Sequence, residues 1–159
     1  MTTSESSRGR EWASLAELEE SDREQVMKRR YEELADLSEE ERKVALASME
    51  KAVYELSEDK SRLLTLSRLR TWLNLEPATA AKISTSFDAI TDLMPGATAM
   101  RHIALVQTVA REFTPRDQAR LEALFPRIFG ALRPSENIAV PAKAASTPAK
   151  KSWWPFWKK

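Results

Sequence analysis

Few residues of this sequence are suited to acid–base or metal chemistry. His102 is the only histidine, and the absence of cysteine excludes disulfides, thiol catalysis and cysteine-based metal sites. A general base needs a partner within hydrogen-bond reach, and the residues around His102 indicate none. The run Glu39–Glu41 is typical of the first turn of a helix, not of a metal site. We therefore predict no catalytic residue, bound metal or cofactor, and expect His102 at the surface or half-buried on a helix.

Cationic side chains form a second group of candidates. No acidic residue occurs between Asp59 and Glu76, and a basic helix in this stretch can contact phosphate groups. The candidate anion-binding residues are Lys60, Arg62, Arg68 and Arg70. The alternative is that they form ordinary ion pairs with acidic residues of the preceding helices. No helix-turn-helix signature accompanies them, so we do not expect nucleic acid as the main partner.

The most informative candidates are aromatic. Three of the five tryptophans fall within five positions, at Trp153, Trp154 and Trp157, with Phe156 between them. They follow a stretch of Ala, Pro, Ser, Thr and Lys that has little to bury, so these rings must be sheltered elsewhere. Indole rings favour the headgroup level of a bilayer, and nearby lysines are attracted to anionic lipids. The lysines on the two sides of the aromatic run are Lys150, Lys151, Lys158 and Lys159.

In composition this tip resembles the tryptophan-rich, proline-containing cationic membrane-active peptides. The resemblance implies shallow and salt-sensitive binding, and Pro155 prevents the regular helix that deeper insertion would need. Two alternatives remain: the tip docks in a hydrophobic groove of a protein partner, where aromatic residues are the usual anchors, or it folds back onto its own helices.

The charge distribution favours a negative surface as the partner of the tip. No Asp or Glu follows Glu136, and five lysines do, so that segment carries +5. Because the whole chain carries +1, residues 1–136 carry −4. An acidic body with a basic arm is typical of a molecule whose arm binds an anionic surface.

The residues before this arm show a repeated pattern that predicts helices. Six segments open with an apolar residue at steps of 18 to 20, followed two positions later by Glu or Pro, which favour a first helical turn. The openers are Leu18, Leu37, Leu56, Leu75, Leu93 and Phe113. Ser38, Ser57 and Thr114 are candidate N-caps, and Ser38 with Glu41 forms a capping box.

Apolar residues inside these segments recur every three or four positions, and no window alternates as a half-buried strand would. We predict an all-α fold, a compact bundle of about six short helices at a period of about 19 residues. Pro126 should end the sixth helix and leave a short final turn before Gly130. The alternative is a short α-solenoid of three helical hairpins. In either arrangement Trp72 is expected in the core.

The sequence thus divides into four parts. They are a polar flexible N-terminus (1–14), a helical domain (15–133), a disordered Pro/Ala/Lys linker (134–149) and the Trp-rich cationic tip (150–159). We expect a cytoplasmic, non-enzymatic adaptor whose helical body binds a protein partner and whose tip attaches reversibly to an anionic membrane surface. The alternative is an interaction module whose tip docks into a protein. A nucleic-acid-associated regulator that uses the basic third helix ranks third.

Overall fold

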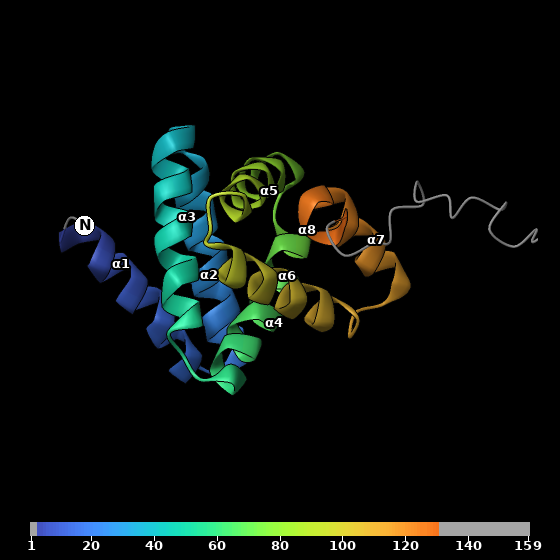
Figure 1. Cartoon of the computed structure of the whole chain (residues 1–159), viewed down its shortest axis with the longest axis horizontal. Coiled ribbons are helices and arrows are strands. Elements are labelled where there is room, and N and C mark those ends of the chain that lie inside the picture. Colours follow the sequence, from blue (N-terminus) through green and yellow to red (C-terminus); the bar gives the residue numbers. More distant parts are fainter. Residues whose placement is uncertain (1–2, 131–159) are drawn as a thin grey trace, which may run out of the picture.

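The computed structural model describes residues 3–130, which form eight α-helices and a short 3-10 helix without any strand (Figure 1). The all-α class and the compact packing predicted from the sequence are confirmed. The helices are α1 (Thr3–Ser14), η1 (Leu15–Glu17, the 3-10 helix), α2 (Glu20–Ala35), α3 (Glu39–Tyr54), α4 (Glu58–Asn74), α5 (Pro77–Thr91), α6 (Gly96–Ala110), α7 (Pro115–Leu124) and α8 (Pro126–Gly130). The six predicted helices are α2 to α7, and α8 is the short turn expected after Pro126.

Helix starts follow the local sequence signals. Ser38 and Glu41 form the predicted capping box at the start of α3, where the Glu41 N–H donates to the Ser38 hydroxyl and the Glu41 carboxylate accepts from the Ser38 N–H. Ser57 and Thr114 cap α4 and α7 with their side chains. Pro115 begins α7, where its missing N–H costs no helical hydrogen bond.

The N-terminal segment differs from the prediction. Residues 1–14 were expected to be polar and flexible, but Thr3–Ser14 form helix α1, which packs on α3. Gly9 allows this close approach, because a Cβ there would lie only 3.3 Å from the Ser48 carbonyl oxygen. The anchor of α1 is Trp12, which is buried with its ring edge against Tyr31, 5.4 Å between centroids. One buried indole and one glycine contact thus hold a helix whose other residues are mostly polar.

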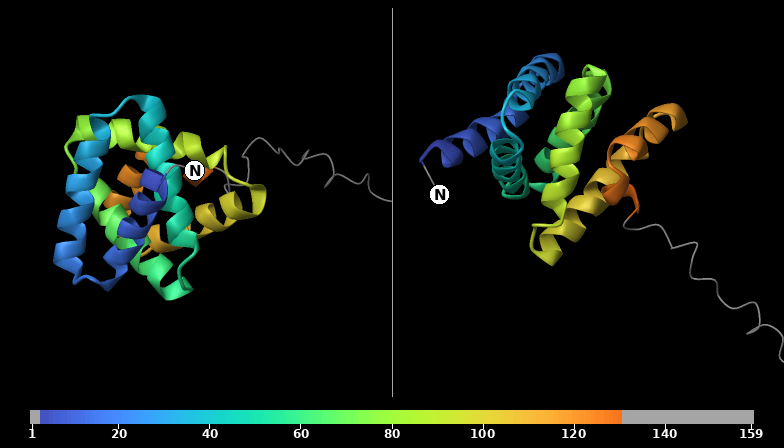
Figure 2. Two further views of the ribbon diagram at one scale, coloured as in Figure 1. Left: turned by 90° about the vertical axis from the view of Figure 1, so that its left-hand side faces the viewer. Right: turned by 90° about the horizontal axis from the view of Figure 1, so that it is seen from above.

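Helices that are two apart in the chain pack most extensively on one another. One row runs α1, α3, α5 and the other α2, α4, α6, whereas consecutive helices share fewer contacts. Seen from above, the chain advances from α1 and α2 at one side to α7 and α8 at the other (Figure 2). The antiparallel pairing of consecutive helices that we expected from the short connections is therefore not the main packing mode.

Two buried arginines, one helix repeat apart, fix this alternation. Each binds the carbonyl oxygen five residues before it and the hydroxyl of a serine 44 residues after it, two helices further along the chain. Each arginine therefore closes the turn before its own helix and ties that helix to the next one in its row. The two sets are Arg23 with Leu18 and Ser67, at 2.9 and 2.8 Å, and Arg42 with Leu37 and Ser86, at 2.8 and 3.0 Å.

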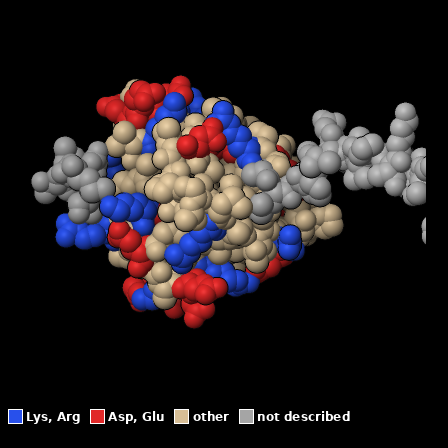
Figure 3. Space-filling model, viewed as in Figure 1, with Lys and Arg blue, Asp and Glu red and all other residues tan. Residues whose placement is uncertain are grey.

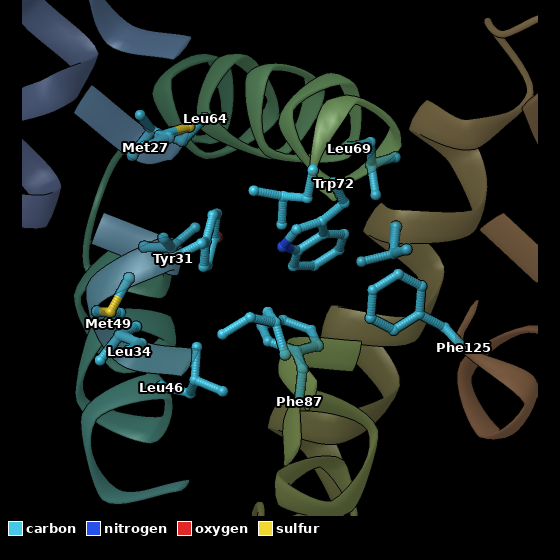
Figure 4. Packing of buried hydrophobic residues seen from close by; sticks show 14 of the residues in the cluster. Met27, Tyr31, Leu34, Leu46, Met49, Leu64, Leu69, Trp72, Phe87 and Phe125 are labelled. Atoms are coloured by element: carbon cyan, nitrogen blue, oxygen red, sulfur yellow. The ribbon is translucent and has the colours of Figure 1, made fainter. Parts of the chain in front are cut away.

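Trp72 of α4 lies at the centre of the core, as predicted (Figure 4). Its ring centroid is 5.9 Å from that of Tyr31, 4.8 Å from that of Phe87 and 4.4 Å from that of Phe125. These partners belong to α2, to α5 and to the turn after α7. One indole thereby joins the two helix rows to the C-terminal end of the described domain.

The short helix α8 is held by side chains of α5 and α6. The backbone N–H groups of Arg127 and Ile128 donate to the Asp88 carboxylate at 3.0 and 3.2 Å, and Gln107 Nε2 donates to the Ile128 carbonyl at 2.7 Å. Burial raises the pKa of the Asp88 carboxyl, although the two N–H donors oppose this. The chain therefore leaves the described domain from a fixed point.

The contact of Gly9 with α3 leads to the first prediction. Gly9→Gln should lower the free energy of unfolding by about 1–3 kcal/mol, because the added side chain forces α1 away from Ser48 and Ala52. Urea unfolding measures the loss, and amide hydrogen exchange should accelerate first in α1. The matched control is Gly96→Gln, since a Cβ at Gly96 meets nothing within 4 Å. Equal unfolding midpoints for the two variants would contradict the close approach.

Candidate functional site

The residues that the sequence favours most lie outside the described part of the chain. The aromatic run 153–157 and its flanking lysines belong to residues 131–159, which the structure does not describe. Their role in binding stays a prediction. The described residues bear on the other candidates, namely the basic third helix and His102.

The basic residues of the predicted third helix, now α4, all have carboxylate partners. Lys60, Arg62 and Arg70 are partly exposed and form ion pairs with neighbouring helices or with η1. Their partners are, in the same order, Glu17, Glu112 and Glu20 together with Glu24. The alternative reading as ordinary ion pairs thus describes these three, and acidic and basic side chains are interspersed over the face seen in Figure 3.

The fourth basic candidate, Arg68, is only 1 % exposed. Its guanidinium forms a buried ion pair with Glu50 of α3 and lies 5.2 Å from the ring centroid of Trp72 and 5.0 Å from that of Phe87. Aromatic faces attract a desolvated cation, so both rings stabilise it. An anion in solution cannot reach this side chain, and Arg68 drops out as an anion-binding residue.

His102 of α6 completes the buried cluster, and the expectation of a surface or half-buried histidine was wrong. Its side chain is fully buried. Nδ1 lies 3.3 Å from Glu50 Oε2 and 2.5 Å from the Tyr54 hydroxyl oxygen, and the ring centroid is 5.2 Å from that of Phe87. The sequence carries no local signal for this position, because the partners of His102 come from helices far away in the chain.

Electrostatics keep the central pair charged. Burial by itself would raise the pKa of the Glu50 carboxyl, but the Arg68 guanidinium and His102 outweigh it and hold that pKa below its usual range. In the same way Glu50 keeps the pKa of Arg68 raised against the effect of its own burial. A carboxylate held as an anion by a fixed cation is poorly suited to move protons at neutral pH.

The geometry of the cluster fits a positioning role within the fold. Its hydrogen bonds and ion pairs join α3, α4 and α6. Glu50, Arg68 and His102 line neither of the two surface hollows that the structure describes. Within residues 3–130, no group of three His, Asp or Glu side chains is arranged to hold a metal ion. The cluster therefore fixes the register of three helices.

A better candidate for binding is a groove of about 430 Å³ between α1 and α2. Apolar side chains make up much of its lining: Trp12, Leu15, Val26, Leu34, Leu37 and Met49. The Trp12 indole N–H has no acceptor among the described residues. A buried donor without a partner is rare in folded proteins and is satisfied when a ligand brings an oxygen. We term this hollow the α1–α2 groove.

The two walls of the α1–α2 groove are joined by one side chain. Arg30 of α2 binds Glu11 of α1 and Glu33 of α2, both at 3.1 Å. With Arg8, these residues give the rim two positive and two negative charges. The sequence did not reveal the groove, because α1 was not recognised as a helix; the single tryptophan at position 12 was the available signal.

The buried ion pair leads to the second prediction. Glu50→Gln keeps the shape of the side chain but leaves Arg68 buried without a counter-ion, so it should cost about 3–5 kcal/mol of unfolding free energy at pH 7. Adding Arg68→Met removes that uncompensated charge and should recover part of the loss. Glu32→Gln, at an exposed pair with Lys28, is the matched control and should cost less than about 1 kcal/mol.

The same pair predicts a pH dependence. Since the pKa of Glu50 is lower in the folded protein, its contribution is present above the unfolded-state pKa of about 4.3 and is lost as the pH falls through the lower folded value. The stability difference between the parent and Glu50→Gln should therefore shrink below about pH 4. Urea unfolding at pH 7 and pH 3 measures it, and a difference independent of pH would contradict an ionised Glu50.

Comparison with known proteins adds no relative to this picture. No family model, no curated protein and no solved structure matches the chain. The functional argument depends on the geometry of the α1–α2 groove, the buried cluster and the residue pattern of the tip.

Proposed function

We propose that this chain is a non-enzymatic adaptor that attaches reversibly to an anionic membrane surface through its C-terminal tip. The observation that carries the proposal is the aromatic run Trp153–Trp157 with lysines on both sides. The run follows a helical domain whose core already holds Trp12 and Trp72. The acidic body and the basic arm support a negative surface as the partner of the tip.

The energy of such an anchor falls in the reversible range. Four partly buried aromatic rings contribute about 1–1.5 kcal/mol each. Four lysines near an anionic leaflet add at most about 4 kcal/mol in total, and ordering the segment reduces the sum. Because part of this energy is electrostatic, salt should weaken the attachment. Within residues 3–130, no helix combines the length and the apolarity needed to cross a bilayer.

For the body, the proposal assigns recognition of a protein partner. The turn between α5 and α6 supports it, since Leu93 is 76 % exposed and Met100 is 52 % exposed. Residues 93–100 contain no charged side chain. Large exposed apolar side chains that lie close together are typical of a surface that another protein covers.

Vesicle co-sedimentation tests the membrane attachment. The full chain should pellet with vesicles that contain anionic lipid, remain in the supernatant with purely zwitterionic vesicles, and dissociate from the anionic ones as salt is raised. A chain that ends at Ala149 should stay in the supernatant with both, because it lacks the aromatic run and four lysines.

A second pair of variants separates the two contributions. Trp153→Ala with Trp154→Ala and Trp157→Ala keeps every lysine, and the matched variant replaces the four tip lysines by Gln and keeps every aromatic ring. Both should weaken binding, and only the lysine variant should lose most of its salt dependence. Pelleting that is unchanged by truncation at Ala149 would overturn the anchor, and the absence of pelleting by the full chain would leave the protein-docking role of the tip as the better hypothesis.

A further inference from the structure

We propose that the tip Trp153–Trp157 docks into the α1–α2 groove of its own chain when no membrane is present. The docking stands on the geometry of the groove. The consequence that docking competes with membrane attachment rests on the function proposed above, and the experiment separates the two.

The lining of the groove fits an aromatic peptide. Trp12, Leu34 and Met49 provide apolar surface, and a volume of about 430 Å³ is that of a site for one or two large side chains. The unpartnered Trp12 N–H requires an acceptor, which a peptide carbonyl supplies as the backbone passes over the groove. An indole ring with its own backbone carbonyl therefore meets both requirements of the site.

Charge also favours the tip as the occupant. At the rim, Arg8 and Arg30 balance Glu11 and Glu33, so the groove itself does not repel a cationic segment. The body as a whole carries −4 and the residues after Glu136 carry +5. Opposite net charges on two parts of one chain raise the encounter rate between them.

The connecting chain is long enough to reach the groove. Residues 131–152 separate α8 from the first tip tryptophan, and 22 residues span at most about 70–80 Å when extended. Their root-mean-square span is about 26 Å in a flexible regime. A domain of this length has a radius of gyration of about 14 Å. The tip therefore reaches from the α8 side of the domain to the α1 side (Figure 1).

The other described hollow fits the tip less well. It has a volume of about 580 Å³ and lies between α3, α5 and the α7–α8 turn, nearer to the point where the chain leaves the domain. Its lining consists largely of small side chains such as Ala81, Ser84 and Ala89, with Leu124 as its one large apolar residue. None of its lining residues carries a buried unpartnered donor. Proximity alone does not make it an aromatic site.

Docking would reduce membrane attachment by keeping the tip occupied. The apparent affinity of a segment that is free for only a fraction of the time falls by that fraction. If nine tips in ten are docked, release of the tip strengthens vesicle binding about tenfold. The groove then acts as an internal competitor of the membrane.

Nuclear magnetic resonance of the indole N–H groups tests the docking directly. The Trp12 Nε1–H signal, assigned with Trp12→Phe, should differ between the full chain and the chain that ends at Ala149, because only the former supplies an acceptor. Val26→Glu in the groove should remove the difference. Val44→Glu is the matched control, since Val44 is 48 % exposed on α3 and lines neither hollow, and it should leave the difference intact.

If Val26→Glu disturbs the fold, the triple Trp→Ala variant of the tip provides a second readout with an unaltered body. Its Trp12 signal should match that of the truncated chain. Identical Trp12 signals in the parent, truncated and triple-variant chains would overturn the proposal. So would a change seen only when unlabelled full chain is added to labelled truncated chain at high concentration, because the occupant would then be a second copy.

Vesicle binding separates this proposal from the proposed function. Val26→Glu should bind anionic vesicles several-fold more tightly than Val44→Glu, and both carry the same added charge. Equal vesicle affinities together with an unchanged Trp12 signal would mean that the membrane anchor holds and the docking fails. A tip-dependent Trp12 shift without any pelleting would mean that the docking holds and the membrane function fails.

Discussion

The burial of one cation, Arg68, constrains the helices around it. Its guanidinium has left water, so it needs both a counter-charge and polarisable neighbours. Glu50 of α3 supplies the charge, and the rings of Trp72 in α4 and Phe87 in α5 supply the neighbours. Glu50 in turn contacts His102 of α6. A shift of any of these four helices by one residue would separate a buried charge from its partner, so the pair specifies the register more than it adds stability.

The helix period explains why this cluster can assemble. A step of about 19 residues brings equivalent positions of alternate helices together, and the arginine contacts repeat with that step. Arg23 and Arg42 each hold the turn before their own helix and a serine two helices later. The third equivalent position holds Ser61, whose hydroxyl donates to the Val53 carbonyl instead. The repeat is therefore preserved in the packing and changes its chemistry along the chain.

Local signals predicted the elements, and long-range packing decided the rest. The caps at Ser38 and Thr114 act within one helical turn, so their sequence pattern sufficed. The burial of Arg68 and His102 depends on partners 18 and 52 residues away, which no pattern along one helix can reveal. The α1–α2 groove was missed because Trp12 lies among polar residues, and polarity of a segment does not prevent one large side chain from docking it.

The fixed end of the domain gives the tail its mechanical context. Asp88 and Gln107 hold the backbone of α8, so the residues that follow start from a defined point and not from a fraying helix. The tip at the other end of that segment is amphipathic, and the α1–α2 groove and an anionic bilayer offer it similar chemistry: an apolar floor beside polar groups that accept or donate hydrogen bonds. Because one set of rings cannot occupy both, the distribution between the two follows from their relative affinities and from the effective concentration that the tether sets. Tether length and groove affinity together then determine how much anionic surface is needed to draw the tip away.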